Sequence, residues 1–522
     1  MANACCFILF IALLSNCECA RILSVFPSIG YSQFKLGERL IEELVAKGHD
    51  VTVISLFEPK NPENYTTITL KELKEMYNPG SGPELTQDVD LITDVKMVYE
   101  VGYYITEEIL KHEKVQNLLK SDAKIDLVLM EHFFNEAHMG FAKHFDAHLV
   151  LLSSIGLCEW NYNLLGNSFL PSINSVSFLH QTNSMNFWER LKNTFVGLSI
   201  NLYQDFVSYP KQQEYLDKYF LEKMDLKDLM YSAELMLLNS DPSVGDNFES
   251  NRATIEIGGF HIKEKPLPEQ LQRFLDTAEE GVILFSLGSN VKSTDLSIEK
   301  IQDILNVFAA LKQRVIWKFE DLDMIEVPNN IIVSKWVPQT DILAHRNMIV
   351  FITHGGILST TESIFYGVPM IGIPLFGDQR MNVARSVKNG HTIHLPLRDL
   401  NAETLQTAID EILNNPKYQA NARKRSNILR DKPILPIELA MFWIEHVLRH
   451  DGIDYLRSTS LDLSWYQKYL LDVILFVVLI SLSSLVLFIF TVKKIILRIY
   501  SQNNKTALTS HTNEKKKKKK KN

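Results

Sequence analysis

The stretch from Trp336 to Gln379 has the sequence WVPQTDILAHRNMIVFITHGGILSTTESIFYGVPMIGIPLFGDQ. Its apolar run at 348–353 (MIVFIT) has the length of a buried strand, and the turn 354–356 (HGG) follows it directly. We expect a helix to begin near Ser359, with Glu362 in its first turn. A strand, a glycine-rich turn and a helix in this order predict a parallel α/β unit, whose helix start offers free amides and a positive dipole end to a pyrophosphate.

Polar and aromatic side chains accompany this turn. Trp336 can stack on a flat base, and Glu362 can accept both hydroxyls of a ribose, as an acidic residue does in dinucleotide-binding folds. A structural turn would explain HGG alone, so the accompanying residues carry the prediction of a nucleotide-sugar site. The candidate donor-binding residues in the stretch are Trp336, Gln339, His354, Gly355, Gly356, Ser359, Glu362, Asp378 and Gln379.

Strand-like and helix-like segments alternate on both sides of the stretch. Short apolar runs joined by helices predict parallel sheets that are buried on both faces. The expected strands are 22–28, 50–57, 125–131, 148–154 and 234–240 in the first half and 281–289, 314–320, 331–337, 348–353 and 368–374 in the second, with helices at 33–47, 297–312 and 359–366. The fold class is therefore α/β, with two doubly wound Rossmann-like domains that face a cleft. We place the first domain at 20–261, a proline-containing linker at 262–269 and the second domain at 270–469.

The two ends of the chain have a different character. Residues 5–15 form an apolar core of signal-peptide length, which predicts a signal peptide over 1–19. Residues 473–492 are uncharged and long enough to cross a hydrocarbon core, so we predict a transmembrane helix at 470–492. Lys493 and Lys494 follow at once, and the positive-inside rule then places a basic tail, 493–522, in the cytosol and the body on the other side.

The tail closes with seven lysines, Lys515 to Lys521, which predict a solvated, disordered segment. Lys519 and Lys520 also resemble the dilysine signal that returns membrane proteins to the endoplasmic reticulum. The expected location is thus the membrane of that compartment, as a single-pass type I protein with a lumenal body. The sequon at Asn64 would then be open to glycosylation.

The net charge excludes a nucleic-acid-binding protein, and the cysteine content excludes a fold stabilised by disulfides. The formal net charge of the chain is −8, and the tail from residue 493 onward carries +10. The residues before it, which include the body, therefore carry a net charge near −18. So acidic a body has no basic footprint for nucleic acid. Four of the five cysteines lie in the signal segment, and Cys158 alone remains, so the mature chain has no internal disulfide.

The spaced residues from Trp336 to Gln379 resemble the signature of the UDP-glycosyltransferases, most closely the membrane-bound UDP-glucosyl and UDP-glucuronosyltransferases of arthropods. The similarity extends to the turn 285–289 (FSLGS), in which Gly288 and Ser289 would bind phosphate. The resemblance implies the two-domain GT-B fold, a UDP-sugar donor with UDP-glucose ahead of UDP-glucuronate, inversion at the anomeric carbon, and no metal or other cofactor. It also implies hexosyl transfer to small lipophilic acceptors, as in detoxifying conjugation.

The resemblance breaks at the catalytic base. Family members place a histidine after the first strand with a carboxylate behind it; here Gln33 occupies the place of the histidine, and Glu131 occupies that of the carboxylate. An amide cannot accept a proton near neutral pH. Three hypotheses follow. The protein transfers sugar to amines, thiols or acidic phenols, which need little help from a base, or it uses another base such as Glu131, His132 or His138. Alternatively, it is a non-catalytic relative that binds nucleotide sugar or a lipophile.

Three further features leave alternatives open. The aromatic segment 164–229 suits an acceptor pocket, a membrane-facing surface or ordinary core. Two Asp-x-Asp strings, 88–90 and 321–323, could suggest metal-bound phosphates, but we interpret them as solvated charges because neither lies beside the donor motif. Membrane lipid is an expected partner, and a homo- or hetero-oligomer is compatible with the sequence.

Overall fold

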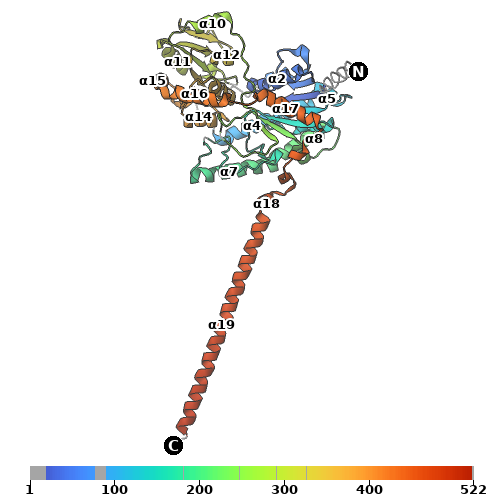
Figure 1. Cartoon of the computed structure of the whole chain (residues 1–522), viewed down its shortest axis with the longest axis vertical. Helices are drawn as coiled ribbons and strands as arrows, with labels where there is room; N and C mark the ends of the chain where they lie inside the picture. Colours follow the sequence, from blue (N-terminus) through green and yellow to red (C-terminus); the bar gives the residue numbers. More distant parts are fainter. Residues whose placement is uncertain are drawn as a thin grey trace, which may run out of the picture. The chain divides into compact units, whose positions relative to one another are not determined.

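The computed structural model describes residues 19–76, 90–179, 181–245, 247–289, 291–324 and 326–519, and it divides the chain into a body that ends at Ser458 and a C-terminal unit from Thr459 (Figure 1). The predicted signal segment lies outside the described residues, apart from its last residue, Cys19, and so does Asp88. The two units are described separately.

The first half of the body is built on a seven-stranded parallel sheet with the order β3-β2-β1-β4-β5-β6-β7. Its strands are nearly continuous runs of buried Val, Ile and Leu, as expected for a sheet covered by helices on both faces. They span β1 (Arg21–Phe26), β2 (Asp50–Ser55), β3 (Thr66–Thr69), β4 (Leu127–Glu131), β5 (His148–Ser153), β6 (Leu235–Leu238) and β7 (Thr254–Glu256). The five strands predicted here are all present, each within a few residues of its expected bounds.

The second half repeats the design with six parallel strands in the order β10-β9-β8-β11-β12-β13. They span β8 (Val282–Ser286), β9 (Arg314–Lys318), β10 (Ile331–Ser334), β11 (Met348–Thr353), β12 (Met370–Gly372) and β13 (Thr392–His394). Five of these were predicted from apolar runs. β13 was not, because its sequence, TIH, contains a single apolar residue and gives no apolar run.

Helices cover both faces of each sheet. Those of the first half are α2 (Tyr31–Ala46), α3 (Lys71–Met76), α4 (Leu91–Lys111), α5 (Glu113–Leu119), α6 (Gly140–His144), α7 (Phe187–Tyr203), α8 (Tyr209–Tyr219) and α9 (Leu226–Met230). Those of the second half are α10 (Glu269–Asp276), α11 (Ile298–Ala310), α12 (Gln339–Leu343), α13 (Ile357–Tyr366), α14 (Gln379–Lys388), α15 (Ala402–Asn414) and α16 (Pro416–Arg430).

The last helix of the body, α17 (Pro436–Arg449), crosses back to the first sheet, where its residues Ala440, Met441 and Ile444 are buried beside α2 (Figure 1). The chain therefore passes between the two halves twice. This second crossing joins them more firmly than the segment 262–269 alone would.

The strand orders fix where a ligand can bind. In the first sheet the order reverses between β1 and β4, and in the second it reverses between β8 and β11. Ligands of open parallel sheets bind at the carboxyl ends of the strands, at such a switch point. Gln33 follows β1 and Glu131 ends β4, while Gly288 follows β8 and His354 follows β11. The predicted acceptor and donor residues therefore occupy the two switch points.

The C-terminal unit contains α18 (Trp465–Lys468) and the long helix α19 (Leu471–Lys519). Within α19 the segment Leu471–Thr506 contains an 18-residue window with a mean hydropathy of 3.1, and α19 is the one helix among the described residues long and apolar enough to cross a membrane. The helix continues through the lysines to Lys519, so our prediction of a disordered lysine tail was wrong for the described part. No glycine or proline after residue 493 stops the helix, and lysine is a good helix former.

Candidate active site

A cavity of about 520 Å³ is lined by residues from both halves of the body. Its size is in the range of ordinary small-molecule sites. All the predicted donor residues line it except Gly355, and Gln33 lines it from the first half, whereas Glu131 does not. The structure thus brings the sequence-predicted site together in one place.

The glycines of the donor turns make room for a histidine. A Cβ on Gly288 would lie 2.5 Å from Cε1 of His354, and one on Gly356 would lie 2.6 Å from its Nε2. Burial, together with the positive charge of Lys318, lowers the pKa of His354 to about 4, so the ring is neutral and can donate one N–H. Gly355 has a φ of +78° and packs on Val383, which explains why it does not face the cavity.

Helix α13 begins two residues before the predicted start. Gly356 is its N-cap and Ile357 its first residue, so Glu362 lies in the second turn and our placement of Glu362 in the first turn was wrong. The glycine already has the extended conformation that a cap requires, with φ −58° and ψ 149°. The amides free to meet an anion are therefore those of the residues just after the HGG turn, including Ser359.

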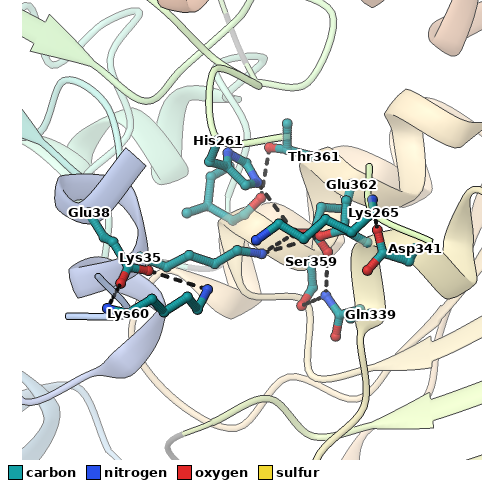
Figure 2. A network of polar contacts seen from close by, with 12 residues as sticks. Lys35, Glu38, Lys60, His261, Lys265, Gln339, Asp341, Ser359, Thr361 and Glu362 are labelled. Atoms are coloured by element: carbon teal, nitrogen blue, oxygen red, sulfur yellow. Dashed lines mark hydrogen bonds and ion pairs between the residues drawn. The ribbon is translucent and has the colours of Figure 1, made fainter. Parts of the chain in front are cut away.

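Glu362 is the most heavily engaged side chain of the cavity (Figure 2). Its carboxylate accepts hydrogen bonds from Gln339 Nε2 at 2.7 Å and from Thr340 Oγ1 at 2.9 Å, and His261 Nε2 lies 3.5 Å away. Gln339 Nε2 also lies 3.1 Å from the Ser359 hydroxyl oxygen. The predicted ribose-binding carboxylate, Glu362, is therefore held in place by Gln339 before a ligand arrives.

Lys35 reaches this carboxylate from the other half of the body. It extends from α2, and its Nζ lies 3.2 Å from both Glu362 Oε1 and Thr340 Oγ1 (Figure 2). Burial by itself would raise the pKa of Glu362, but Lys35, His261 and Gln339 outweigh it and hold this pKa far below its ordinary value. The sequence offered no signal for Lys35, because an exposed-looking lysine on an amphipathic helix is usually solvated.

Asp378 and Gln379 follow β12, as predicted, and stand at the start of α14, which was not predicted. Both side chains make hydrogen bonds within the protein. Gln379 Oε1 accepts the backbone N–H of Leu375 at 2.9 Å, which leaves its NH₂ group to meet a ligand. Asp378 accepts a hydrogen bond from Asn382 at 2.6 Å, and burial raises its pKa to about 6. Asp378 is thus a hydrogen-bonding group of variable charge near neutral pH.

The base position is occupied by an amide in direct contact with a serine. Gln33 lies in the first turn of α2 and donates from Nε2 to the Ser154 hydroxyl at 3.2 Å. Behind them Glu131 is fully buried at the end of β4, and its carboxyl oxygens make no hydrogen bond of standard geometry to any described residue. Burial raises the pKa of Glu131 to about 7, although Ser154 and Gln33 partly offset this effect.

The alternative bases do not reach the cavity. His132 and His138 are buried and are not among the residues that line it. His132 lies 3.5 Å from Glu136, and His138 faces Asn135 at 3.1 Å, so both are held by their own neighbours. Asp321 and Asp323 are exposed and also lie outside the cavity lining.

The wall opposite the donor residues is apolar. Its side chains are Val98, Phe133, Ile155, Trp160 and Phe178. Trp160 and Phe178 belong to a buried aromatic cluster from the segment 164–229 and its surroundings, with their ring centroids 5.8 Å apart. Such a wall suits a lipophilic molecule better than a sugar.

Trp336 lies at the cavity mouth and is 55% exposed. Its ring meets Tyr31 of α2 edge to face, with centroids 5.1 Å apart and planes at 87°. Because more than half of the indole surface is open, a flat base can still stack on it.

Comparison with known proteins identifies the family. Residues 22–507 match the family model described as UDP-glucoronosyl and UDP-glucosyl transferase. The chain belongs to the UDP-glycosyltransferase family. UDP-glucosyltransferase 2 of Dactylopius coccus is 34% identical to this transferase over 90% of this chain and 92% of its own length. UDP-glucuronosyltransferase 2B9 of Macaca fascicularis is 30% identical over 88% of this chain and 90% of its own length.

Solved structures agree on the fold. The crystallised glycotransferase of kitacinnamycin superposes on the transferase with a TM-score of 0.57 at 20% identity. This match covers 83% of this chain and 100% of the crystallised one. CalG4, the calicheamicin glycosyltransferase, superposes with a TM-score of 0.54 at 17% identity. This match covers 83% of this chain and 99% of CalG4. The transferase therefore has the GT-B fold, as the resemblance implied, and it is a hexosyltransferase that uses a UDP-sugar.

The raised pKa of Glu131 predicts a pH-dependent stability. The folded protein keeps this proton up to a pH near 7, whereas the unfolded chain releases it near 4.5. Because the folded state binds more protons in this window, Glu131 destabilises the protein progressively as the pH rises from about 4.5 to about 7. Glu131→Gln should raise the free energy of unfolding by about 2 to 3 kcal/mol at pH 8 and change it little at pH 4.5, as measured by urea denaturation in detergent.

The exposed residue Glu63 offers a matched control, since Glu63→Gln should leave the pH dependence unchanged. An equal effect of Glu131→Gln at both pH values would show that Glu131 is ionised in the folded protein throughout.

Proposed function

We propose that the transferase moves a hexose from a UDP-sugar, with inversion and without a metal, to small lipophilic acceptors, and that UDP-glucose is preferred over UDP-glucuronate. The observation that carries the proposal is the shared cavity, in which the donor motif faces the apolar wall formed by residues such as Phe133 and Trp160. The relative named UDP-glucosyltransferase 2 supports glucose as the sugar.

The roles on the donor side follow from position. Trp336 stacks on the uracil, and Glu362 with Gln339 binds the ribose hydroxyls. His354 and the amides at the start of α13 face the diphosphate together with Ser289. Asp378 and Gln379 bind the sugar hydroxyls. Lys318 and Lys35 line the same cavity and supply the positive charge that a leaving diphosphate needs.

The reaction is a single displacement. The acceptor atom attacks the anomeric carbon from the side opposite the diphosphate, and the bond between this carbon and the phosphate oxygen breaks. UDP leaves with the bonding electron pair, and the acceptor loses a proton. Holding both substrates in one cavity supplies much of the rate by proximity and orientation.

The absence of a base limits which acceptor nucleophiles can react. Gln33 can accept a hydrogen bond from the nucleophile, but it cannot take its proton. Glu131 does not line the cavity, and His132 and His138 do not either. The chain therefore favours nucleophiles that need no base before attack, namely amines, thiols or acidic phenols, over ordinary alcohols.

Gln33→His tests this preference. A positioned base contributes about 10² to 10⁴ in rate, so the variant should transfer sugar to aliphatic alcohols at least about tenfold faster than the natural chain. Transfer to an aromatic amine should change little. The measurement is product formation from labelled UDP-glucose with matched alcohol, phenol and amine acceptors.

Gln33→Leu is the matched control, because it removes the amide and adds no base; it should not gain activity on alcohols. Equal activity of the natural chain and Gln33→His on alcohols would place the base elsewhere. Loss of transfer to amines in all three proteins would contradict the proposed acceptor class.

We further propose that the transferase resides in the endoplasmic reticulum with its body in the lumen. The apolar helix α19 and the basic residues after it support a single-pass anchor with a cytosolic tail.

Glycosylation of Asn64 reports this orientation, because Asn64 is exposed on the body in a short helical turn, Pro62–Asn64. Expression in animal cells should give a glycan that endoglycosidase H removes, and Asn64→Gln should abolish the resulting mobility shift. An unglycosylated Asn64 in membrane-integrated protein would contradict a lumenal body.

A further inference from the structure

Helix α7 presents an apolar stripe to the outside of the body. It spans Phe187–Tyr203 and continues through a π-helical turn, Gln204–Ser208, along one edge of the body (Figure 1). Trp188 is 73% exposed, Phe195 63% and Phe206 76%. The exposed apolar side chains recur every three or four residues and are Phe187, Trp188, Leu191, Phe195, Leu198, Leu202, Phe206 and Val207.

The opposite face of α7 is fixed in the core, so the stripe cannot turn inward. Asn193 accepts the backbone N–H of Val176 at 2.8 Å and donates to the carbonyl of Asn174 at 2.7 Å. A Cβ on Gly197 would come within 2.9 Å of the Phe169 ring, which shows how closely the helix is seated.

A capping box also fixes the start of α7. The Asn186 side chain accepts the N–H of Glu189, and the Glu189 side chain accepts the N–H of Asn186. The helix is therefore a well-defined element, and the exposure of its apolar stripe belongs to the native structure.

The charge of this face identifies its partner. Among the exposed side chains from 187 to 207, only Lys192 and Asp205 are charged, and their charges cancel. A helix with aromatic and leucine side chains on one face suits the boundary between headgroups and acyl chains of a bilayer. The body carries a net charge near −18, so attraction to anionic lipid cannot hold it there, and the contact must be apolar.

The chain itself keeps a bilayer within reach. The body ends at Ser458 and the apolar helix begins at Leu471, so about a dozen residues connect them. Such a connector spans at most roughly 40 Å when fully extended. It also contains Trp465, Tyr466 and Tyr469, all exposed, which are the residue types enriched at membrane interfaces. A body tethered so closely meets the bilayer at high effective concentration.

We propose that the exposed stripe of α7 inserts into the lipid interface and forms a second membrane contact of the body, separate from α19. The buried side of α7 packs into the same aromatic cluster that contains Trp160 and Phe178 of the cavity wall. A continuous apolar layer thus joins the membrane contact to the acceptor side of the cavity. This contact does not depend on the acceptor class proposed above.

The test uses the full chain in phosphatidylcholine nanodiscs with an environment-sensitive fluorophore on a single cysteine. Leu198→Cys places the label on the stripe, and Lys424→Cys places it on an exposed polar helix as a matched control. Both are made in a Cys19→Ser background, in which the remaining described cysteine, Cys158, is buried and stays unlabelled. At Leu198 the emission should shift to the blue, and doxyl-labelled lipid should quench it at least about threefold more strongly than at Lys424. The quenching should persist in 1 M NaCl, because the contact is apolar.

Phe195→Cys provides a second site on the same stripe and should give the same result. Equal quenching at Leu198 and Lys424 would overturn the proposal. A blue shift without lipid quenching, accompanied by crosslinking between two copies through Leu198→Cys, would also overturn it and would assign the stripe to a second copy of the chain. Quenching that requires anionic lipid and disappears in salt would contradict an apolar contact. None of these outcomes depends on transferase activity.

Discussion

The buried carboxylate of Glu362 is the interaction on which the site depends. An ionised group without solvent needs polar partners. Here Gln339 and Thr340 of the second half and Lys35 of the first half donate hydrogen bonds to it, and His261, at the end of the first half, lies 3.5 Å away. Lys35 therefore joins the two halves of the body across the cavity. A donor ribose that takes its place on Glu362 must share or displace Lys35, so donor binding and the seating of α2 are linked.

Helix α2 therefore contributes side chains to both substrate sites. Its first turn carries Gln33 toward the acceptor wall, and its next residues carry Lys35 toward the donor site, so one short segment faces both substrates. The replacement of a base by Gln33 consequently alters the proton transfer while leaving the donor contacts in place. Ser154 holds the amide of Gln33, and Glu131 lies behind as a carboxyl group whose pKa is raised by burial.

Local pattern was enough to predict the strands, because buried parallel strands are continuous apolar runs, and spacing was enough to gather His354, Glu362 and Asp378 at one site. Three features depend on long-range contacts that no local pattern encodes: the reach of Lys35 to Glu362, the return of α17 to the first sheet, and the withdrawal of Glu131 from the cavity. Within the segment 164–229, one face of α7 is core, which was one of the alternatives, and the other face is exposed.

The donor site itself is tested most directly by calorimetric titration of UDP against His354→Ala. His391→Ala is the control, because burial also lowers the pKa of His391 to about 4, but this residue lies outside the cavity lining. The natural chain and His391→Ala should bind UDP alike, and His354→Ala should lose at least about tenfold in affinity, the equivalent of about 1.4 kcal/mol. Unchanged UDP affinity in His354→Ala would contradict a donor site at the HGG turn.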